Sequence, residues 1–107
     1  MKRPQIVQAI KSALYKVAPT AEVILYGSEV RGDAHENSDI DLLILVEKEK
    51  ITNQDIINIA YPLYELEEEF NYQVNISPIV YTRKQWYGRP FRTPFYISVM
   101  NEGVKLQ

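Results

Sequence analysis

Two short apolar runs separated by a polar stretch constrain the fold more than any other feature of the sequence. Residues 22–26 (EVILY) and residues 39–46 (DIDLLILV) have the length and the aliphatic content of buried strands. The stretch between them holds two glycines and several other turn formers, so the chain can leave one strand and return along the next. We therefore predict two strands, adjacent in one sheet, with a polar loop at one end.

Helical patterns flank these strands. Apolar residues recur at helical spacing in residues 4–17 and again in residues 53–70, where Thr52 or Asn53 can cap the helix and Pro62 should bend it. A third strand is expected over residues 72–81, at an edge of the sheet or ending irregularly, because Pro78 cannot donate a ladder hydrogen bond. A turn of helix over residues 83–87 and a terminal helix over residues 94–100 complete an α/β sandwich with one sheet.

Length and charge narrow the class of protein. The 107 residues predict a single domain over residues 1–107, and the formal charge of -2 disfavours broad attraction to long nucleic acids or anionic membranes. Cysteine is absent and histidine occurs once, which excludes disulfides, thiolate zinc sites and histidine-rich metal sites. No apolar run approaches the roughly 20 residues of a membrane span, so we expect a cytoplasmic protein with no membrane contact.

Asp39 and Asp41 open the second apolar run, one residue apart. Side chains alternate across a strand, so both carboxylates should point to the same face. Ionised carboxylates at such short range repel, and keeping both charged calls for a cation; hard oxygen ligands suit Mg²⁺ or Mn²⁺. The pair is a candidate metal site, although the same two residues are also typical of an exposed strand start.

Gly27 and Ser28 close the first run and could bind phosphate. Glycine permits close approach of a ligand, and the serine hydroxyl can cap a short helix whose first amides favour an anion. Arg31 can add a positive charge on the same side. Singly, these residues are typical of a turn and a solvated arginine, but their joint spacing with the acid pair favours a polyphosphate cradle beside a metal site.

Read as Gly-Ser, ten residues, then Asp-x-Asp, the segment from residues 27–28 to residues 39–41 resembles the signature of the minimal nucleotidyltransferases, within the DNA polymerase beta-like superfamily. Residues 31–32 and Ser38 fit the same signature. The order of elements over most of the chain is compatible with the single-domain members of that family. The resemblance implies the nucleotidyltransferase fold, with a mixed sheet that carries the site at one end.

The resemblance also implies a reaction. Asp39 and Asp41 would hold two divalent ions, Mg²⁺ or Mn²⁺, and Gly27, Ser28 and Arg31 would contact the phosphates of a nucleoside triphosphate, for which ATP is expected. An acceptor hydroxyl would attack the α-phosphate and pyrophosphate would leave. In family members paired with a HEPN protein the acceptor is a protein tyrosine and the pair forms a toxin and an antitoxin, so a HEPN-type partner is implied here too.

One departure from the family pattern bears on activity. Active members carry a third carboxylate on a later strand, whereas the polar face of the expected third strand offers Gln73, Asn75 and Ser77. Asn75 is the best match and would be a weak metal ligand, because an amide carbonyl brings neither negative charge nor a base. Rescue by Glu29 or by a glutamate of residues 67–69 has no support in the sequence. The alternative to an enzyme is a catalytically weak module that binds nucleotide or protein, as an antitoxin would.

Two other features stay open. His35 lies in the polar loop, where it is a surface residue or reaches a phosphate or base. The aromatic and basic tail of residues 83–95 predicts either a packed terminal lid or a protein-binding surface, with neither favoured.

Overall fold

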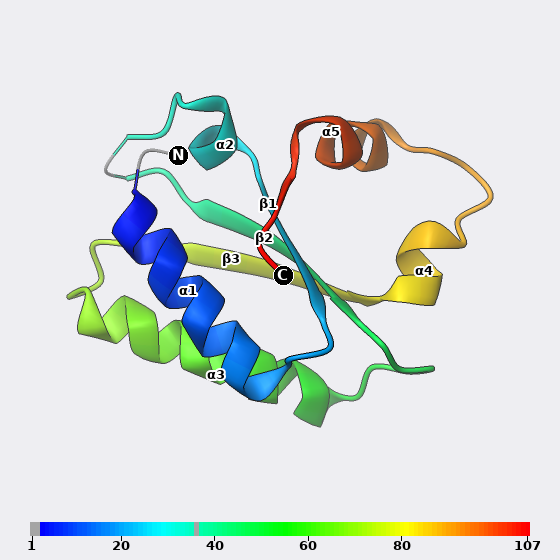
Figure 1. Cartoon of the computed structure of the whole chain (residues 1–107), viewed down its shortest axis with the longest axis horizontal. Coiled ribbons are helices and arrows are strands. Elements are labelled where there is room, and N and C mark those ends of the chain that lie inside the picture. Colours follow the sequence, from blue (N-terminus) through cyan, green and yellow to red (C-terminus); the bar gives the residue numbers. More distant parts are fainter. Residues whose placement is uncertain (1–2, 36) are drawn as a thin grey trace.

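The computed structural model describes residues 3–35 and 37–107 and contains one four-stranded sheet with helices on both faces (Figure 1). Its elements follow in this order along the chain: α1 (Pro4–Val17), β1 (Glu22–Tyr26), α2 (Ser28–Arg31), β2 (Ile40–Val46), α3 (Asn53–Glu69), β3 (Ile76–Thr82), α4 (Arg83–Tyr87), α5 (Pro94–Glu102) and β4 (Val104–Lys105). None of the helices in the described part of the chain is long and apolar enough to cross a membrane.

The sheet is mixed, with the strand order β3-β2-β1-β4. β1 pairs antiparallel with β2 and with β4, whereas β2 and β3 are parallel and joined through α3. The adjacency of the first two strands and the edge position of the third, where Pro78 pairs with Leu42 of β2, confirm the sequence-based expectations. A mixed sheet of this kind also confirms the predicted fold class.

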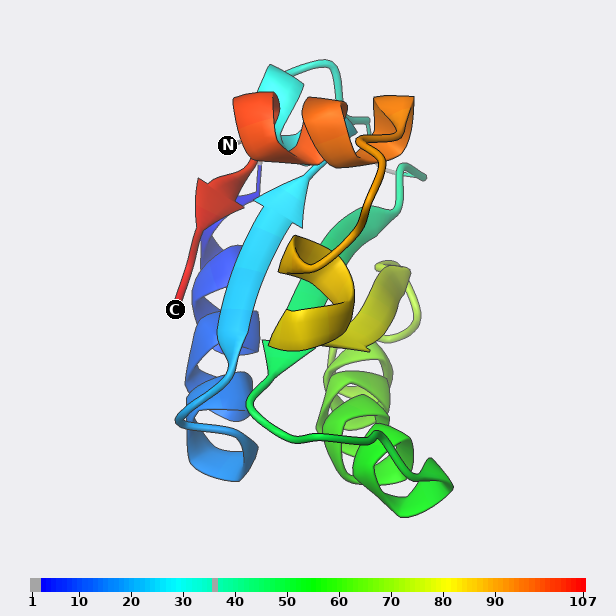
Figure 2. The ribbon, with the colours of Figure 1, turned by 90° about the vertical axis from the view of Figure 1, so that its right-hand side faces the viewer.

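β2 is the central buried strand, and its alternate side chains enter two separate cores. Leu42 and Ile44 pack under α1 and α3, while Leu43 and Leu45 pack on the opposite face with Trp86 of α4. Figure 2 shows α4 and α5 on the face away from α1 and α3. A strand buried on both faces reads as a continuous apolar run, which explains the sequence of residues 42–46.

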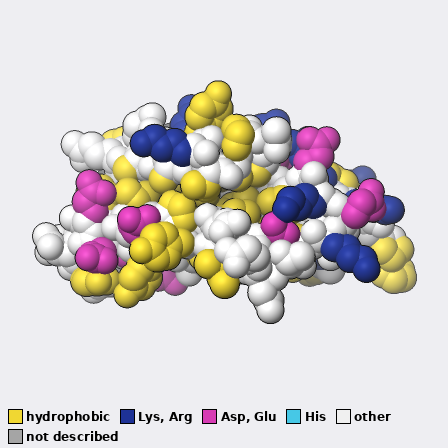
Figure 3. Space-filling model, turned by 90° about the horizontal axis from the view of Figure 1, so that it is seen from below, with side chains coloured by type: hydrophobic (Ala, Val, Ile, Leu, Met, Phe, Trp, Pro, Cys, Tyr) yellow, Lys and Arg dark blue, Asp and Glu magenta, His cyan; other side chains and the backbone are white. Residues whose placement is uncertain are grey.

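Helix termini follow local sequence signals. Thr52 caps α3 and forms a capping box with Asp55, and Thr82 does the same for α4 with Gln85. α3 continues through Pro62 as one helix over Asn53–Glu69. Seen from the side of α3, hydrophobic side chains lie among scattered charges of both signs (Figure 3).

β3 begins later than the sequence predicts. Asn71 and Tyr72 have φ angles of 56° and 58°, in the left-handed region, so the chain turns there instead of extending. The strand starts at Ile76, whose amide donates to Glu67 Oε2 at 2.9 Å. The prediction of a strand from residue 72 was therefore wrong at its first four positions, and Asn75 precedes the strand.

Candidate nucleotide-binding site

The two aspartates lie at the start of β2, on one face of the sheet. Asp41 is level with Tyr26 of β1 and with Ser77 of β3, and Oδ2 of Asp39 lies 3.5 Å from Ser77 Oγ. Asp39 is exposed and Asp41 is half-buried. The expected juxtaposition of these carboxylates is therefore present in the structure.

Electrostatics at Asp41 reflect this crowding. Burial is the main cause that raises the pKa of Asp41, and the neighbouring Asp39 carboxylate raises it further, while the Arg31 guanidinium lowers it. A carboxylate with a like charge beside it favours a cation at this point.

Gly27 makes room directly beside Asp41. Its φ of +82° is a conformation that residues with side chains rarely adopt, and a Cβ atom added there would lie 2.5 Å from Asp41 Oδ2. The turn from β1 into α2 thus requires glycine for two reasons, backbone conformation and space next to the acid. Of the residues predicted to contact phosphate, Gly27 has the clearest structural requirement.

Ser28 and Arg31 lie at the two ends of α2, which follows Gly27 at once. Arg31 Nε lies 3.4 Å from Asp33 Oδ2, and its Nη1 lies 3.6 Å from Glu102 Oε2 of α5. Its side chain is 48% exposed, so these ion pairs are weak and the guanidinium can exchange them for another anion. The structure thus brings all the predicted phosphate contacts to the end of the sheet that carries Asp41.

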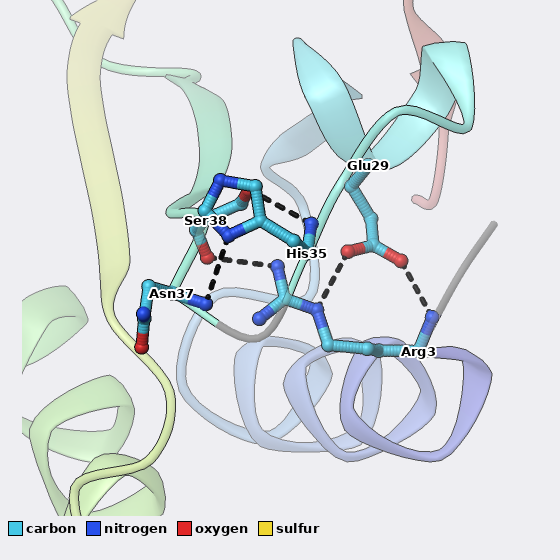
Figure 4. A network of polar contacts seen from close by, with 5 residues as sticks. All are labelled: Arg3, Glu29, His35, Asn37 and Ser38. Carbon is cyan, nitrogen blue, oxygen red and sulfur yellow. Dashed lines mark hydrogen bonds and ion pairs between the residues drawn. The ribbon is translucent and has the colours of Figure 1, made fainter.

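A contact that the sequence did not reveal fastens this end of the molecule. Figure 4 shows the Arg3 side chain between Glu29 and Ser38. Arg3 Nε donates to Glu29 Oε1 at 2.8 Å, its backbone amide donates to Glu29 Oε2 at 2.6 Å, and its Nη2 donates to the Ser38 carbonyl at 2.9 Å. Glu29 is completely buried. Because the partners are 26 and 35 residues apart in the chain, no local pattern could have indicated them.

The loop before Asp39 has internal hydrogen bonds of its own. The His35 amide donates to Ser38 Oγ at 3.0 Å, the Ser38 amide donates to the His35 carbonyl at 2.9 Å, and His35 Nδ1 accepts from the Asn37 amide at 3.3 Å. The exposed His35 therefore has a structural part in the loop.

Ser77, and not a carboxylate, stands beside Asp41 on the neighbouring strand. Asn75 lies one step outside β3, where its carbonyl accepts from the Ile40 amide at 2.8 Å, and its side chain is exposed. Two of the glutamates considered as replacements have other partners: Glu29 pairs with Arg3, and Glu67 accepts from the Ile76 amide.

An aromatic cluster covers the same face of the sheet, next to the acids. Tyr26 packs edge-on against Phe95 with ring centroids 5.5 Å apart, and Phe95 packs in the same way on Trp86 at 5.8 Å. Burial, followed by the Asp41 charge, raises the pKa of Tyr26 to about 12, so its phenol stays protonated at neutral pH. Trp86 is buried and packs against Val99 of α5, so this part of the tail packs as a lid, whereas Phe91 is 79% exposed.

The donor set beside Gly27 fits a hard divalent cation only in part. Asp39 and Asp41 supply carboxylate oxygens on one face, and Ser77 adds a hydroxyl, the kind of ligands Mg²⁺ accepts together with water and phosphate. Within residues 3–35 and 37–107, no group of three or more His, Cys, Asp or Glu side chains comes together that could hold a metal alone. The pair therefore suits a cation that is shared with a polyphosphate.

The fold and this site define a class of protein, and the sequence matches the model of one protein family. Residues 4–106 match the model of the nucleotidyltransferase domain, and the chain belongs to this family. Among curated proteins, it is 43% identical over 89 residues to a protein of Methanocaldococcus jannaschii named "Putative protein adenylyltransferase MJ0141", covering 78% of this chain and 76% of that one.

Two solved structures share the fold. One is described as the crystal structure of a toxin-antitoxin with AMP-PNP; it superposes with a TM-score of 0.60 at 22% identity, covering 94% of this chain and 72% of that chain. The other is described as the crystal structure of "a putative nucleotidyltransferase from Sulfolobus solfataricus"; it has a TM-score of 0.57 at 19% identity and covers 97% of this chain and 81% of that chain. The chain is thus a transferase by family, and its fold is that of the nucleotidyltransferases.

Proposed function

We propose that this protein transfers the nucleoside monophosphate of ATP to a hydroxyl group, with release of pyrophosphate. The observation that carries the proposal is the close approach of Gly27 to Asp41, which brings the turn after β1 directly beside the carboxylate and is possible only because Gly27 has no Cβ atom. The curated relative named as a protein adenylyltransferase supports a protein as the acceptor.

The residues of the chain divide the work. Gly27 and Ser28 admit the triphosphate to the end of the sheet, and Arg31 leaves Asp33 and Glu102 to pair with phosphate oxygens. Asp39 and Asp41 would hold the divalent cation, which would supply positive charge to the phosphates of the nucleotide. The acceptor oxygen forms a bond to the α-phosphorus while the bond to the pyrophosphate oxygen breaks, and the acceptor proton leaves to solvent or to a carboxylate of the pair.

Mg²⁺ or Mn²⁺ bound by Asp39 and Asp41 would neutralise the charge that develops on the phosphate oxygens. Asn75, outside β3, would contribute at most a carbonyl oxygen to such an ion.

The test is label transfer from α-labelled ATP in the presence of Mg²⁺ to a co-expressed protein from the neighbouring reading frame. Wild-type protein should label the acceptor, and Asp41→Asn should lower the rate by at least about 100-fold because the shared cation is lost. Glu49→Gln, at the opposite end of the sheet, is the control and should label as wild type does. Equal labelling by Asp41→Asn and wild type would contradict the proposal.

A second candidate function is a binding module of low activity that masks a protein partner. The specific observation in its favour is Ser77 in the position beside Asp41, since a hydroxyl brings no negative charge to a metal ion and does not act as a base as a carboxylate does. The toxin-antitoxin description of one structural neighbour supports a toxin as the partner of this module. From the resemblance to the minimal nucleotidyltransferases, we propose that this toxin is a HEPN-type protein. Tight binding of Mg²⁺·ATP with no labelling of that partner would favour the module over the enzyme.

A further inference from the structure

The site consists of two segments that extend beyond the last pair of the β1–β2 ladder, Tyr26 with Asp41. α2 carries the phosphate contacts, and the start of β2 carries the acids; between them runs the loop of residues 32–39. In that loop, Gly32 has a φ of +83° and open space where a Cβ would be, so packing at Gly32 does not fix how the two segments face each other.

Arg3 binds both segments at once. Two of its donors engage the two oxygens of Glu29, in the middle of α2, and a third engages the carbonyl of Ser38, the residue before Asp39 (Figure 4). Only a guanidinium offers donors in a fixed planar fork that can serve two acceptors in different segments with one side chain.

Burial makes this contact directional as well as strong. Glu29 has no exposed surface and the Arg3 side chain is 16% exposed, so water screens the pair little. In the four-residue helix α2, Glu29 is the one buried residue, so its contacts with Arg3 help to anchor the turn that carries Ser28 and Arg31.

On these contacts we propose that Arg3 is a positioning residue: through Glu29 and the Ser38 carbonyl it holds the phosphate-binding turn at a fixed distance from the metal-binding acids. The inference rests on the proposed function for what the site binds, but the clamp itself is a statement about this chain. Arg3 does not touch the nucleotide, and its loss separates the two halves of the site without removing any ligand-binding group.

The experiment compares Arg3→Met, Arg3→Lys and Glu29→Gln with wild type by calorimetric titration of Mn²⁺·AMP-PNP. Arg3→Met should bind about tenfold more weakly or worse, since shifts of an ångström at positioning residues have large effects. Arg3→Lys keeps the charge but has no fork, so it should pair with Glu29, lose Ser38 and recover only part of the affinity. Glu29→Gln should lie between these two.

The control separates positioning from general destabilisation. Thr52→Ala removes the cap of α3 at the opposite end of the sheet and lowers stability without touching the site. Where Thr52→Ala has lost as much stability as the Arg3 variants, it should still bind Mn²⁺·AMP-PNP with wild-type affinity. If Thr52→Ala loses as much affinity as the Arg3 variants, or if folded Arg3→Lys and Glu29→Gln bind within twofold of wild type, the positioning role is overturned.

Amide hydrogen exchange tests the clamp, the contact of Arg3 with Glu29 and with the Ser38 carbonyl, without any nucleotide. In Arg3→Lys the amides of residues 29–32 and 39–41 should exchange at least about tenfold faster than in wild type, with residues 43–45 unchanged. Unchanged exchange in residues 29–32 would overturn the clamp. Failure of wild-type protein to bind Mn²⁺·AMP-PNP would instead overturn the proposed function, while the exchange result would still stand.

Discussion

At the scale of single residues, the site depends on the absence of a side chain. Gly27 combines a left-handed φ with contact to Asp41, so any Cβ at this position both strains the turn and meets the carboxylate. Gly27→Ala should therefore cost roughly 1–3 kcal/mol of stability and abolish Mg²⁺·ATP binding. Thermal unfolding and calorimetry measure the two effects. Gly32→Ala is the informative comparison, because its φ is similar but its Cβ would meet open space; it should lose stability and keep binding.

At Ser77 we predict that a substitution improves the site instead of damaging it. Ser77→Asp places a third carboxylate level with Asp41, which should strengthen Mn²⁺ binding and raise the rate of AMP transfer by about tenfold or more. In the absence of metal the variant should be less stable than wild type, because three acids then share one face. A variant that gains neither metal affinity nor rate would show that the site does not use this position.

Sequence reasoning reached the residues joined by local spacing and missed those joined by tertiary contact. Asp39 and Asp41 could be placed on one face because strand alternation is a local rule. Arg3 and Glu29, 26 positions apart, meet only after α1 docks on the sheet. Their sequence signal is that of ordinary surface charges, and only burial distinguishes them.

At the scale of elements, the boundaries depend on capping and on backbone conformation. Helical periodicity and the apolar runs were sufficient to predict α1, α3, β1 and β2. The predicted start of β3 was wrong because Asn71 and Tyr72, which have left-handed φ angles, interrupt a sequence that alternates like a strand. The two-residue β4 has no pattern of its own; it forms because the chain after α5 passes beside β1.

The capping box of α3 gives an acid-sensitive contribution to stability. Hydrogen bonds from Lys48 and from the Thr52 amide and hydroxyl lower the pKa of Asp55 to about 2. A lowered pKa in the folded state means that this stabilisation is complete above about pH 4, near the ordinary value, and is lost as pH falls toward 2. Wild type should therefore lose more stability than Asp55→Asn between pH 5 and pH 2, measured by urea unfolding; parallel curves would contradict this.

At neutral pH, Thr52→Ala should lower the free energy of unfolding by about 1 kcal/mol, because the cap of α3 is lost.

At the scale of the whole molecule, the two cores differ in size and in the face of the sheet that they cover. The core under α1 and α3 holds most of the buried side chains, while the core under α4 and α5 is smaller and lies on the face that carries the acids. Trp86 is the largest side chain buried in the smaller core, and the rings of Tyr81, Phe95 and Tyr96 pack around it.

Trp86→Ala should remove about 3–5 kcal/mol, a large part of the 5–15 kcal/mol typical of a domain. Trp86→Phe is the milder variant, since the indole Nε1 has no hydrogen-bond partner among the described residues and its loss leaves no partner unsatisfied. Urea unfolding should rank wild type and Trp86→Phe well above Trp86→Ala. Equal stability of all three would mean that the tail does not pack as a lid.

The central claim is that one end of the sheet binds a polyphosphate and a divalent cation together, through Gly27 and the acid pair. Calorimetric titration of ATP in the presence and absence of Mg²⁺ tests it most directly, with wild type beside Asp39→Asn and Asp41→Asn. We expect binding by wild type that requires Mg²⁺, loss of that binding in both variants, and thermal stability at least equal to wild type because the repulsion between the carboxylates is relieved. Binding that is independent of Mg²⁺, or undiminished in both folded variants, would contradict the account.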